Sequence, residues 1–107
     1  YNGTIPPSED KVVKYHPFFL GDETDYFGAG ILSFARLGKA KGYTLIYADR
    51  SGSSLFFLRD DLMEGRQFKN AGNPEKLYQT ALATFRPDPK GRIYFSSLDL
   101  IKQEGTQ

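Results

Sequence analysis

The spacing of apolar side chains predicts an amphipathic helix over residues 28–41. Apolar residues recur there every three or four positions, as expected of one helix face: Phe27, Ile31, Phe34, Ala35 and Gly38. The polar side chains Ser33, Arg36 and Lys39 are expected on the opposite, solvent-facing side. Lys41 suits the negative end of the helix dipole, and Gly42 is expected to follow it as the cap. We therefore expect a helix that packs one face on a sheet.

An antiparallel β-hairpin is predicted directly after this helix, with strands over residues 43–48 and 54–59. Both segments are rich in aromatic and β-branched side chains. Five residues that include Gly52 separate them, which suits a hairpin and is too short for a parallel crossover. Because both strands carry apolar side chains at almost every position, we expect both faces of the hairpin to be covered.

A second helix is predicted over residues 74–85. Asn73 is a good N-cap and Pro74 fits the first helical position. The apolar side of this helix would consist of Leu77, Tyr78, Ala81, Leu82 and Phe85, and Pro87 would end it. Shorter extended pieces are expected at residues 11–15 and 92–95, and the polar tail from Lys102 is expected to fray.

The organisation that follows is one domain or half-domain over residues 1–107. Residues 1–27 form a loop and extended lead, because Pro6 and Pro7 cannot lie inside a helix or a central strand. Residues 28–63 form the helix–hairpin core. Residues 64–107 hold the second helix and the tail.

Composition excludes several classes of protein. The chain has 107 residues, no cysteine and one histidine, which excludes disulfide scaffolds, thiolate metal sites, cysteine nucleophiles and multi-histidine metal cages. A net charge of +1 gives no bulk attraction to nucleic acid or to an anionic membrane, so neither is an expected partner. The longest apolar run is far too short for a membrane span. Lack of cysteine fits every compartment, so localisation stays open.

The polar clusters give no catalytic, cofactor-binding or metal-binding set. Gly28-Ala29-Gly30 lacks the third glycine of a phosphate-binding turn, and helix packing explains it better. His16 has no partner at metal-ligand spacing, and the acids Asp22, Glu23 and Asp25 are interpreted as a solvated turn before a helix.

Arg59-Asp60-Asp61 is the most informative charged cluster, because it follows an apolar strand. Its carboxylates could bind a cation or act as acid and base. The favoured interpretation is structural: they end the strand and cap the next segment.

Three blocks of sequence resemble the C-terminal part of FkbM-like S-adenosylmethionine-dependent methyltransferases. They are Asp25-Tyr26-Phe27-Gly28-Ala29, Leu37-Gly38-Lys39-Ala40-Lys41-Gly42-Tyr43-Thr44-Leu45-Ile46-Tyr47 and Leu55-Phe56-Phe57-Leu58-Arg59-Asp60-Asp61-Leu62. The opening Tyr1-Asn2-Gly3-Thr4-Ile5-Pro6-Pro7 is also similar, so the resemblance covers about residues 1–63. It implies an α/β fold: part of a doubly wound, Rossmann-like sheet whose last strand runs antiparallel.

The same resemblance implies that the cofactor site lies elsewhere. In such enzymes S-adenosylmethionine is bound by an N-terminal half that has no counterpart here, so no cofactor is expected for this chain alone. Asn2 would lie near the carboxyl end of a sheet strand, which makes it a candidate on the substrate side. One departure is that Ser53 and Ser54 stand where the family often has Asn before the aromatic pair.

Two functions follow as hypotheses. In the first, the chain is the C-terminal portion of a methyltransferase-like domain, not catalytic alone, and its partner is the missing N-terminal half. In the second, it is a small non-catalytic interaction or scaffold subunit that docks onto another polypeptide, because a half-sheet leaves an edge to be covered. A small autonomous enzyme has no supporting set of residues.

Overall fold

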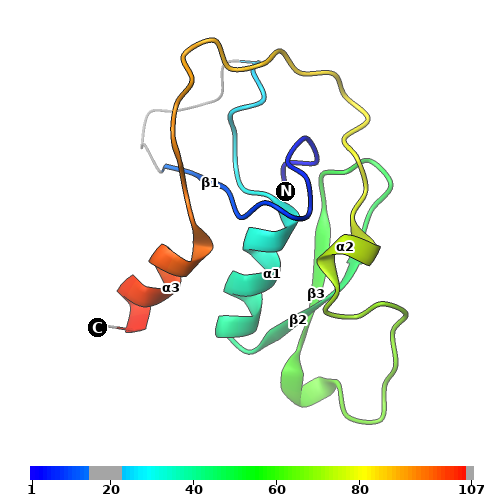
Figure 1. The fold of residues 1–107 in the computed structure, drawn as a ribbon. Helices are drawn as coiled ribbons and strands as arrows, with labels where there is room; N and C mark the ends of the chain where they lie inside the picture. The colour runs from blue at the N-terminus through cyan, green and yellow to red at the C-terminus, as the bar shows by residue number, and fades with distance from the viewer. Residues whose placement is uncertain (15–22, 106–107) are drawn as a thin grey trace.

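The chain forms a small mixed α/β structure, seen in a computed structural model that describes residues 1–14 and 23–105 (Figure 1). In order, its elements are β1 (Val12–Val13), α1 (Ile31–Ala40), β2 (Tyr43–Ala48), β3 (Leu55–Arg59), the 3-10 turn η1 (Asp60–Leu62), α2 (Pro74–Leu77), β4 (Tyr94–Phe95) and α3 (Ser97–Gly105). β1 pairs with β4 and β2 pairs with β3, each antiparallel. The α/β class is thus confirmed, while the described residues contain no parallel Rossmann-like sheet.

Helix α1 begins three residues later than predicted. Gly28 has a positive φ of 59°, and Ala29 forms an isolated bridge with Val12, so neither is helical. Gly30 is the N-cap in an extended conformation, and a Cβ there would lie 2.7 Å from the Ile5 side chain. The predicted C-terminal end is confirmed, because Gly42 has a φ of 88° that only glycine adopts readily.

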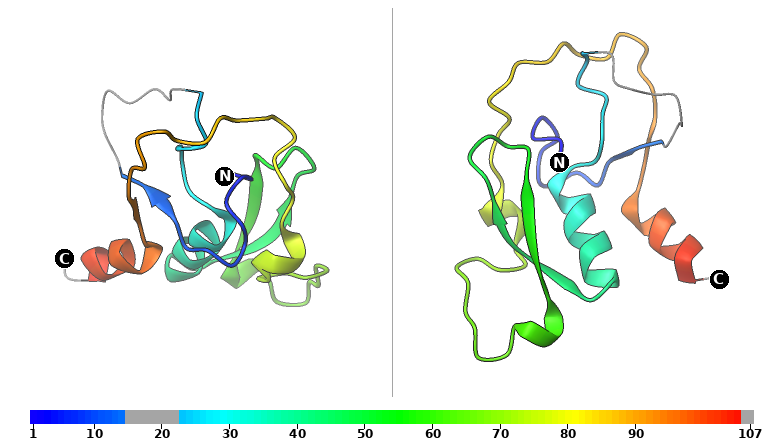
Figure 2. Two further views of the ribbon diagram at one scale, coloured as in Figure 1. Left: turned by 45° about the horizontal axis from the view of Figure 1, so that its top comes forward. Right: turned by 180° about the vertical axis from the view of Figure 1, so that it is seen from behind.

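The hairpin β2–β3 is confirmed, and one of its faces packs on α1. Leu45 and Ala48 are buried there with Ile31 and Leu77, and together they form the core. A register shift between Leu45 and Tyr47 lets both Leu45 and Ala48 point inward although they are three residues apart. Both views of Figure 2 place α1 between the hairpin and α3.

The expectation that both hairpin faces are covered is wrong. Tyr47 and Phe56, which are paired across the two strands, are each 51% exposed. Within residues 1–14 and 23–105 no second layer covers them, because the segment predicted as a long second helix does not form one.

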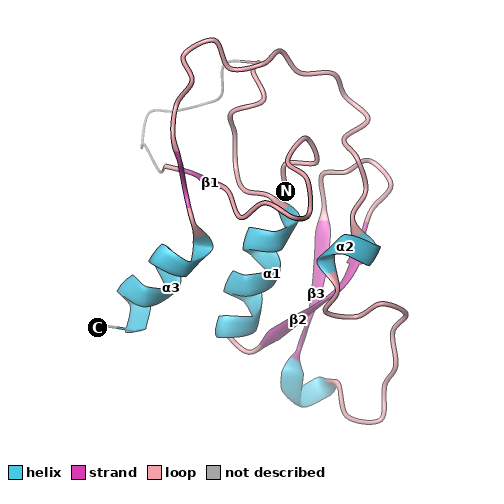
Figure 3. Cartoon of the chain, in the orientation of Figure 1, coloured by secondary structure: helices cyan, strands magenta, loops and turns pink. Residues whose placement is uncertain are grey.

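Helix α2 is only four residues long, so the predicted helix over 74–85 is wrong beyond Leu77. Its start is confirmed, since the Asn73 side chain accepts from the Lys76 backbone N–H at 3.2 Å. After Leu77 the backbone bonds to distant segments instead of its own helix: Ala81 N donates to Gly3 O and Leu82 N to Ser51 O. Figure 3 shows the whole stretch from α2 to β4 as loop.

Close contact between backbones explains this loop. Gly52 has a φ of 73°, and a Cβ at this position would lie 2.6 Å from the Thr80 carbonyl oxygen. Tyr78, predicted on an apolar helix face, donates its hydroxyl to Gly3 O at 2.5 Å. Leu82, predicted on the same face, is 77% exposed.

The predicted extended pieces are confirmed in part: residues 12–13 of the first form β1 and residues 94–95 of the second form β4, while residue 15 lies outside the described residues. The polar tail from Lys102 continues α3 as far as Gly105, and α3 packs on α1; whether this tail frays stays a prediction. Ser97, the first residue of α3, is fully buried and bonds to Asp10, which fixes the start of the helix.

Candidate functional site

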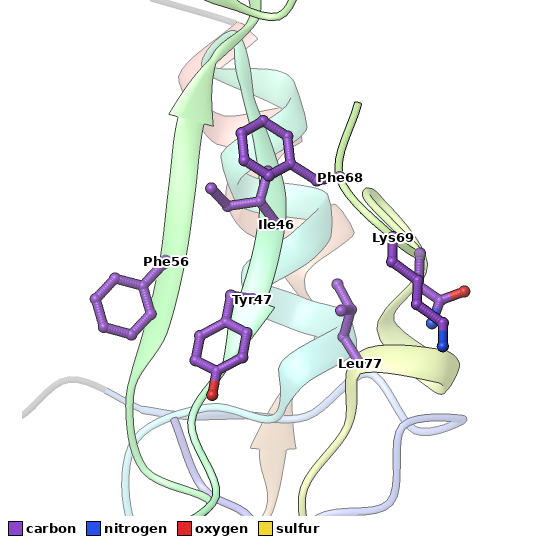
Figure 4. A pocket seen from close by; sticks show the side chains of 7 residues that line it. Ile46, Tyr47, Phe56, Phe68, Lys69 and Leu77 are labelled. Carbon is purple, nitrogen blue, oxygen red and sulfur yellow. The ribbon is translucent and has the colours of Figure 1, made fainter. Parts of the chain in front are cut away.

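The open face of the hairpin carries an apolar groove of about 620 Å³ (Figure 4). The groove is lined by Ile46, Tyr47, Phe56, Phe68, Lys69, Asn70 and Leu77. Tyr47 from β2 and Phe56 from β3 lie side by side with ring centroids 5.8 Å apart. Leu77 of α2 and the loop before α2 form the opposite wall.

Local structure explains why these aromatic side chains point outward. The register shift after Leu45 changes the alternation of β2, so Tyr47 faces away from the core while Ala48 faces into it. Loop 68–72 is held against β2 by a hydrogen bond of 2.7 Å from Gly72 N to Leu45 O. That bond places Phe68, which is 37% exposed, at the rim of the groove.

The groove is chemically simple. Among the described residues that line it, Lys69 alone is charged and Asn70 alone carries an amide side chain. Specific small-molecule sites combine apolar walls with several convergent polar groups. This groove therefore offers contact area more than a catalytic or cofactor-binding geometry.

Asn2, the substrate-side candidate, is fully buried. Its Nδ2 donates to Asp25 O and Phe27 O, both at 2.9 Å, and its Oδ1 accepts from Thr4 N at 3.0 Å and Thr4 Oγ1 at 2.5 Å. Each of its donors and lone pairs is thus used within the chain. Its position gives Asn2 a structural role, in which it ties the first residues to the segment before α1.

Asp10 forms the densest polar cluster among the described residues. Its Oδ1 accepts from Ser33 Oγ at 2.6 Å and from Ser97 N at 2.9 Å. Its Oδ2 accepts from Arg36 Nη1 at 2.8 Å, Ser97 Oγ at 2.7 Å and Ser96 Oγ at 3.0 Å.

These bonds explain the burial of Ser33, which was predicted to face solvent. The side chain of Asp10 is only 11% exposed. Burial by itself raises the pKa of Asp10, but the hydrogen bonds from Ser33, Ser97 and Arg36 outweigh it and hold the pKa well below its usual range. The carboxylate joins the N-terminal lead, α1 and α3, and this role is structural.

The Arg59-Asp60-Asp61 cluster has its partners within the chain. Asp60 accepts hydrogen bonds from Thr44 Oγ1 at 2.5 Å and from Lys39 Nζ at 3.2 Å. These bonds lower the pKa of Asp60. Asp61 accepts from Arg59 Nε at 2.7 Å, which lowers its own pKa. The two carboxylates end β3 as predicted, but neither side chain caps η1.

No group of three or more His, Cys, Asp or Glu side chains that could hold a metal ion occurs in residues 1–14 and 23–105. His16 and Asp22 lie outside the described residues. Gly28 and Gly30, which only partly match a phosphate-binding turn, lie just before α1. Gly28 has a positive φ, and Gly30 is the N-cap of the helix.

Sequence reasoning missed Asp10 and the open groove. The Ser96-Ser97 pair before Asp99 has the chemistry of a helix start and could have indicated α3. No local signal pairs Asp10 with Ser97, because the two are far apart in the sequence.

Comparison with known proteins gives no match: no family model, no curated protein and no solved structure matches the chain. Within the described residues, no helix has the length and apolar composition of a membrane span.

Proposed function

We propose that this chain is a non-catalytic interaction module that packs another polypeptide against the open face of its hairpin. The observation that supports this most directly is the pair Tyr47 and Phe56, half exposed side by side above an apolar groove. Aromatic side chains in such a cluster are typical of protein interfaces. A polypeptide fits better than a small ligand, because the groove is open and poor in polar groups.

A second candidate is the C-terminal portion of a methyltransferase-like domain. What favours it is the order of α1, β2 and β3, which lies within the residues that carry the resemblance. In this candidate the partner polypeptide is an N-terminal half that binds S-adenosylmethionine, and the chain alone holds no cofactor.

Peptide selection with the purified chain tests the interaction module. Peptides enriched from a random library would be titrated into the chain by calorimetry. We expect binding to weaken at least about tenfold when Tyr47→Ser and Phe56→Ser are combined, because both rings would leave the interface. Ile93→Ser is the matched control: Ile93 is 79% exposed but lies outside the groove, so binding should not change.

Two results would contradict the module. One is a library that yields no peptide whose affinity depends on Tyr47 and Phe56. The other is equal loss of affinity in the Ile93→Ser control, which would indicate non-specific apolar contact. Calorimetric binding of S-adenosylmethionine by the chain alone would contradict the proposed absence of the cofactor site.

A further inference from the structure

We infer that the groove beside Tyr47 and Phe56 takes an acidic amphipathic segment of another protein, whose apolar side chains lie on the two rings and whose carboxylates face Lys69. This inference rests on the proposed function and deepens it, because it names the chemistry of the polypeptide that the groove would bind. It depends on charge, whereas the proposed function depends on the exposed rings.

The two walls of the groove differ in chemistry. The hairpin wall is uncharged and consists of Ile46 and Tyr47 of β2 and Phe56 of β3. The opposite wall carries the ammonium group of Lys69, which lies across the groove from the two rings (Figure 4). A segment that fills the groove therefore needs large apolar side chains on one side and negative charge on the other.

Lys69 is exposed, and its charge is not neutralised by a neighbouring acid. Among the described residues, no carboxylate lies within ion-pair distance of its ammonium group. The two acids that follow β3 are already paired, Asp60 with Lys39 and Asp61 with Arg59. The positive charge at the groove is therefore available to a partner.

The loop that carries Lys69 strengthens this positive charge. Residues 65–74 include Arg66 and Lys69, both exposed, and contain no Asp or Glu. A hydrogen bond of 2.7 Å from Gly72 N to Leu45 O ties the loop to β2, which keeps its charges beside the groove. Opposite charges across an interface select the partner and speed its association. Charge complementarity thus assigns acidic side chains to the segment that lies along this loop.

A cation beside aromatic rings is also found where single-stranded nucleic acid binds. Two observations favour a polypeptide here. Ile46, Phe68 and Leu77 add apolar surface that suits side chains better than phosphates. The net charge of the whole chain is only +1, which is small for a protein that binds a polyanion.

Two selections from one random peptide library test the inference, one on the unchanged chain and one on the Lys69→Glu variant. Only peptides that lose affinity when Tyr47→Ser and Phe56→Ser are combined would be compared. Those from the unchanged chain should be rich in Asp and Glu, and those from the variant in Lys and Arg. By calorimetry, an acidic peptide should bind Lys69→Glu at least about fivefold more weakly, because attraction becomes repulsion. The difference should shrink at high salt, since Lys69 is exposed.

Lys90→Glu is the matched control, because it makes the same charge change at an exposed lysine outside the groove. The acidic peptide should bind this control as it binds the unchanged chain. A peptide in which lysine replaces each acid should regain affinity on Lys69→Glu but not on Lys90→Glu. Recovery of this kind shows that the variant is folded and that the pairing is between charges.

Selected peptides that depend on Tyr47 and Phe56 but show no excess of acids would overturn this inference and leave the proposed function intact. Equal losses of affinity in Lys69→Glu and Lys90→Glu would also overturn it, because net charge would then explain the effect. Single-stranded oligouridylate that binds the unchanged chain and not Lys69→Glu, without enrichment of acidic peptides, would overturn it in favour of nucleic acid.

Discussion

Asp10 is the residue on which three segments of the chain depend. Its carboxylate bonds to Ser33 and Arg36 of α1 and to Ser97 at the start of α3. A largely buried carboxylate is stable only when its oxygens are fully paired. Loss of one partner would leave charge or polar groups unsatisfied where water does not reach them easily.

Asp10→Asn should lower the free energy of unfolding by about 2–4 kcal/mol, because an amide nitrogen would face donors that now bond to an oxygen. Urea denaturation measures the change. Glu9→Gln is the matched control: Glu9 is the neighbouring acid, its contact with Lys11 spans 3.6 Å, and both side chains are partly exposed. The control should change stability by less than about 0.5 kcal/mol. Equal effects of the two substitutions would argue against a special role for Asp10.

The lowered pKa of Asp10 also predicts acid sensitivity. A carboxyl group with a lower pKa in the folded state stabilises the fold fully above its ordinary value of 3.8, and this contribution is lost as the pH falls further. Asp60 and Asp61 also have lowered pKa values, so they contribute to the same acid transition. The midpoint of urea unfolding, measured from pH 7 to about pH 3, should therefore fall less steeply in Asp10→Asn than in the unchanged chain. Parallel curves would contradict this assignment.

At the scale of elements, the hairpin places two adjacent phenylalanines on opposite faces. Phe57 faces the core, and a Cβ at Gly38 would lie 2.6 Å from its ring, whereas Phe56 is half exposed. Phe57→Ala should destabilise the chain by about 3 kcal/mol, and Phe56→Ala by about 1 kcal/mol or less. Thermal melting of the two variants checks the difference. Equal losses would mean that the outer face is covered after all.

Local signals predicted the elements whose stability is local. The glycine after α1, the short connection of the hairpin and the Asn73-Pro74 start of α2 are all decided by neighbouring residues. The length of α2 is decided by distant residues instead. Residues 78–82 bond to Gly3, Ser51 and Tyr1, and these distant partners replace the hydrogen bonds of a helix.

The groove could not be predicted from the sequence either, because it too depends on residues that are distant along the chain. Apolar side chains on both sides of β2 and β3 indicated two covered faces, and their composition is the same whether or not a second layer exists. Whether Tyr47 and Phe56 are buried depends on what residues 78–93 do. Those residues form a loop elsewhere and leave the face open.

At the scale of the whole molecule, the core is small for the length of the chain. Among the described residues, the buried hydrophobic side chains are Ile5, Tyr26, Ala29, Ile31, Leu45, Ala48 and Leu77. The radius of gyration is 14.4 Å, larger than the roughly 13 Å typical of 107 residues. Much of the apolar surface therefore lies where a partner could cover it, which agrees with the proposed interaction module.

Dye binding tests that surface without requiring an identified partner. At neutral pH, where the chain is folded, we expect a hydrophobic dye such as ANS to fluoresce on the unchanged chain, because Tyr47 and Phe56 leave apolar surface exposed. Combining Tyr47→Ser with Phe56→Ser should remove most of this fluorescence. Ile93→Ser replaces an exposed side chain outside the groove and should retain it. Circular dichroism of all three proteins must first show the same fold, since a loosened core would also bind dye. A folded chain that binds no dye would leave the interaction module without its supporting surface, while dye binding that persists in the double variant would place the exposed apolar surface somewhere other than this groove.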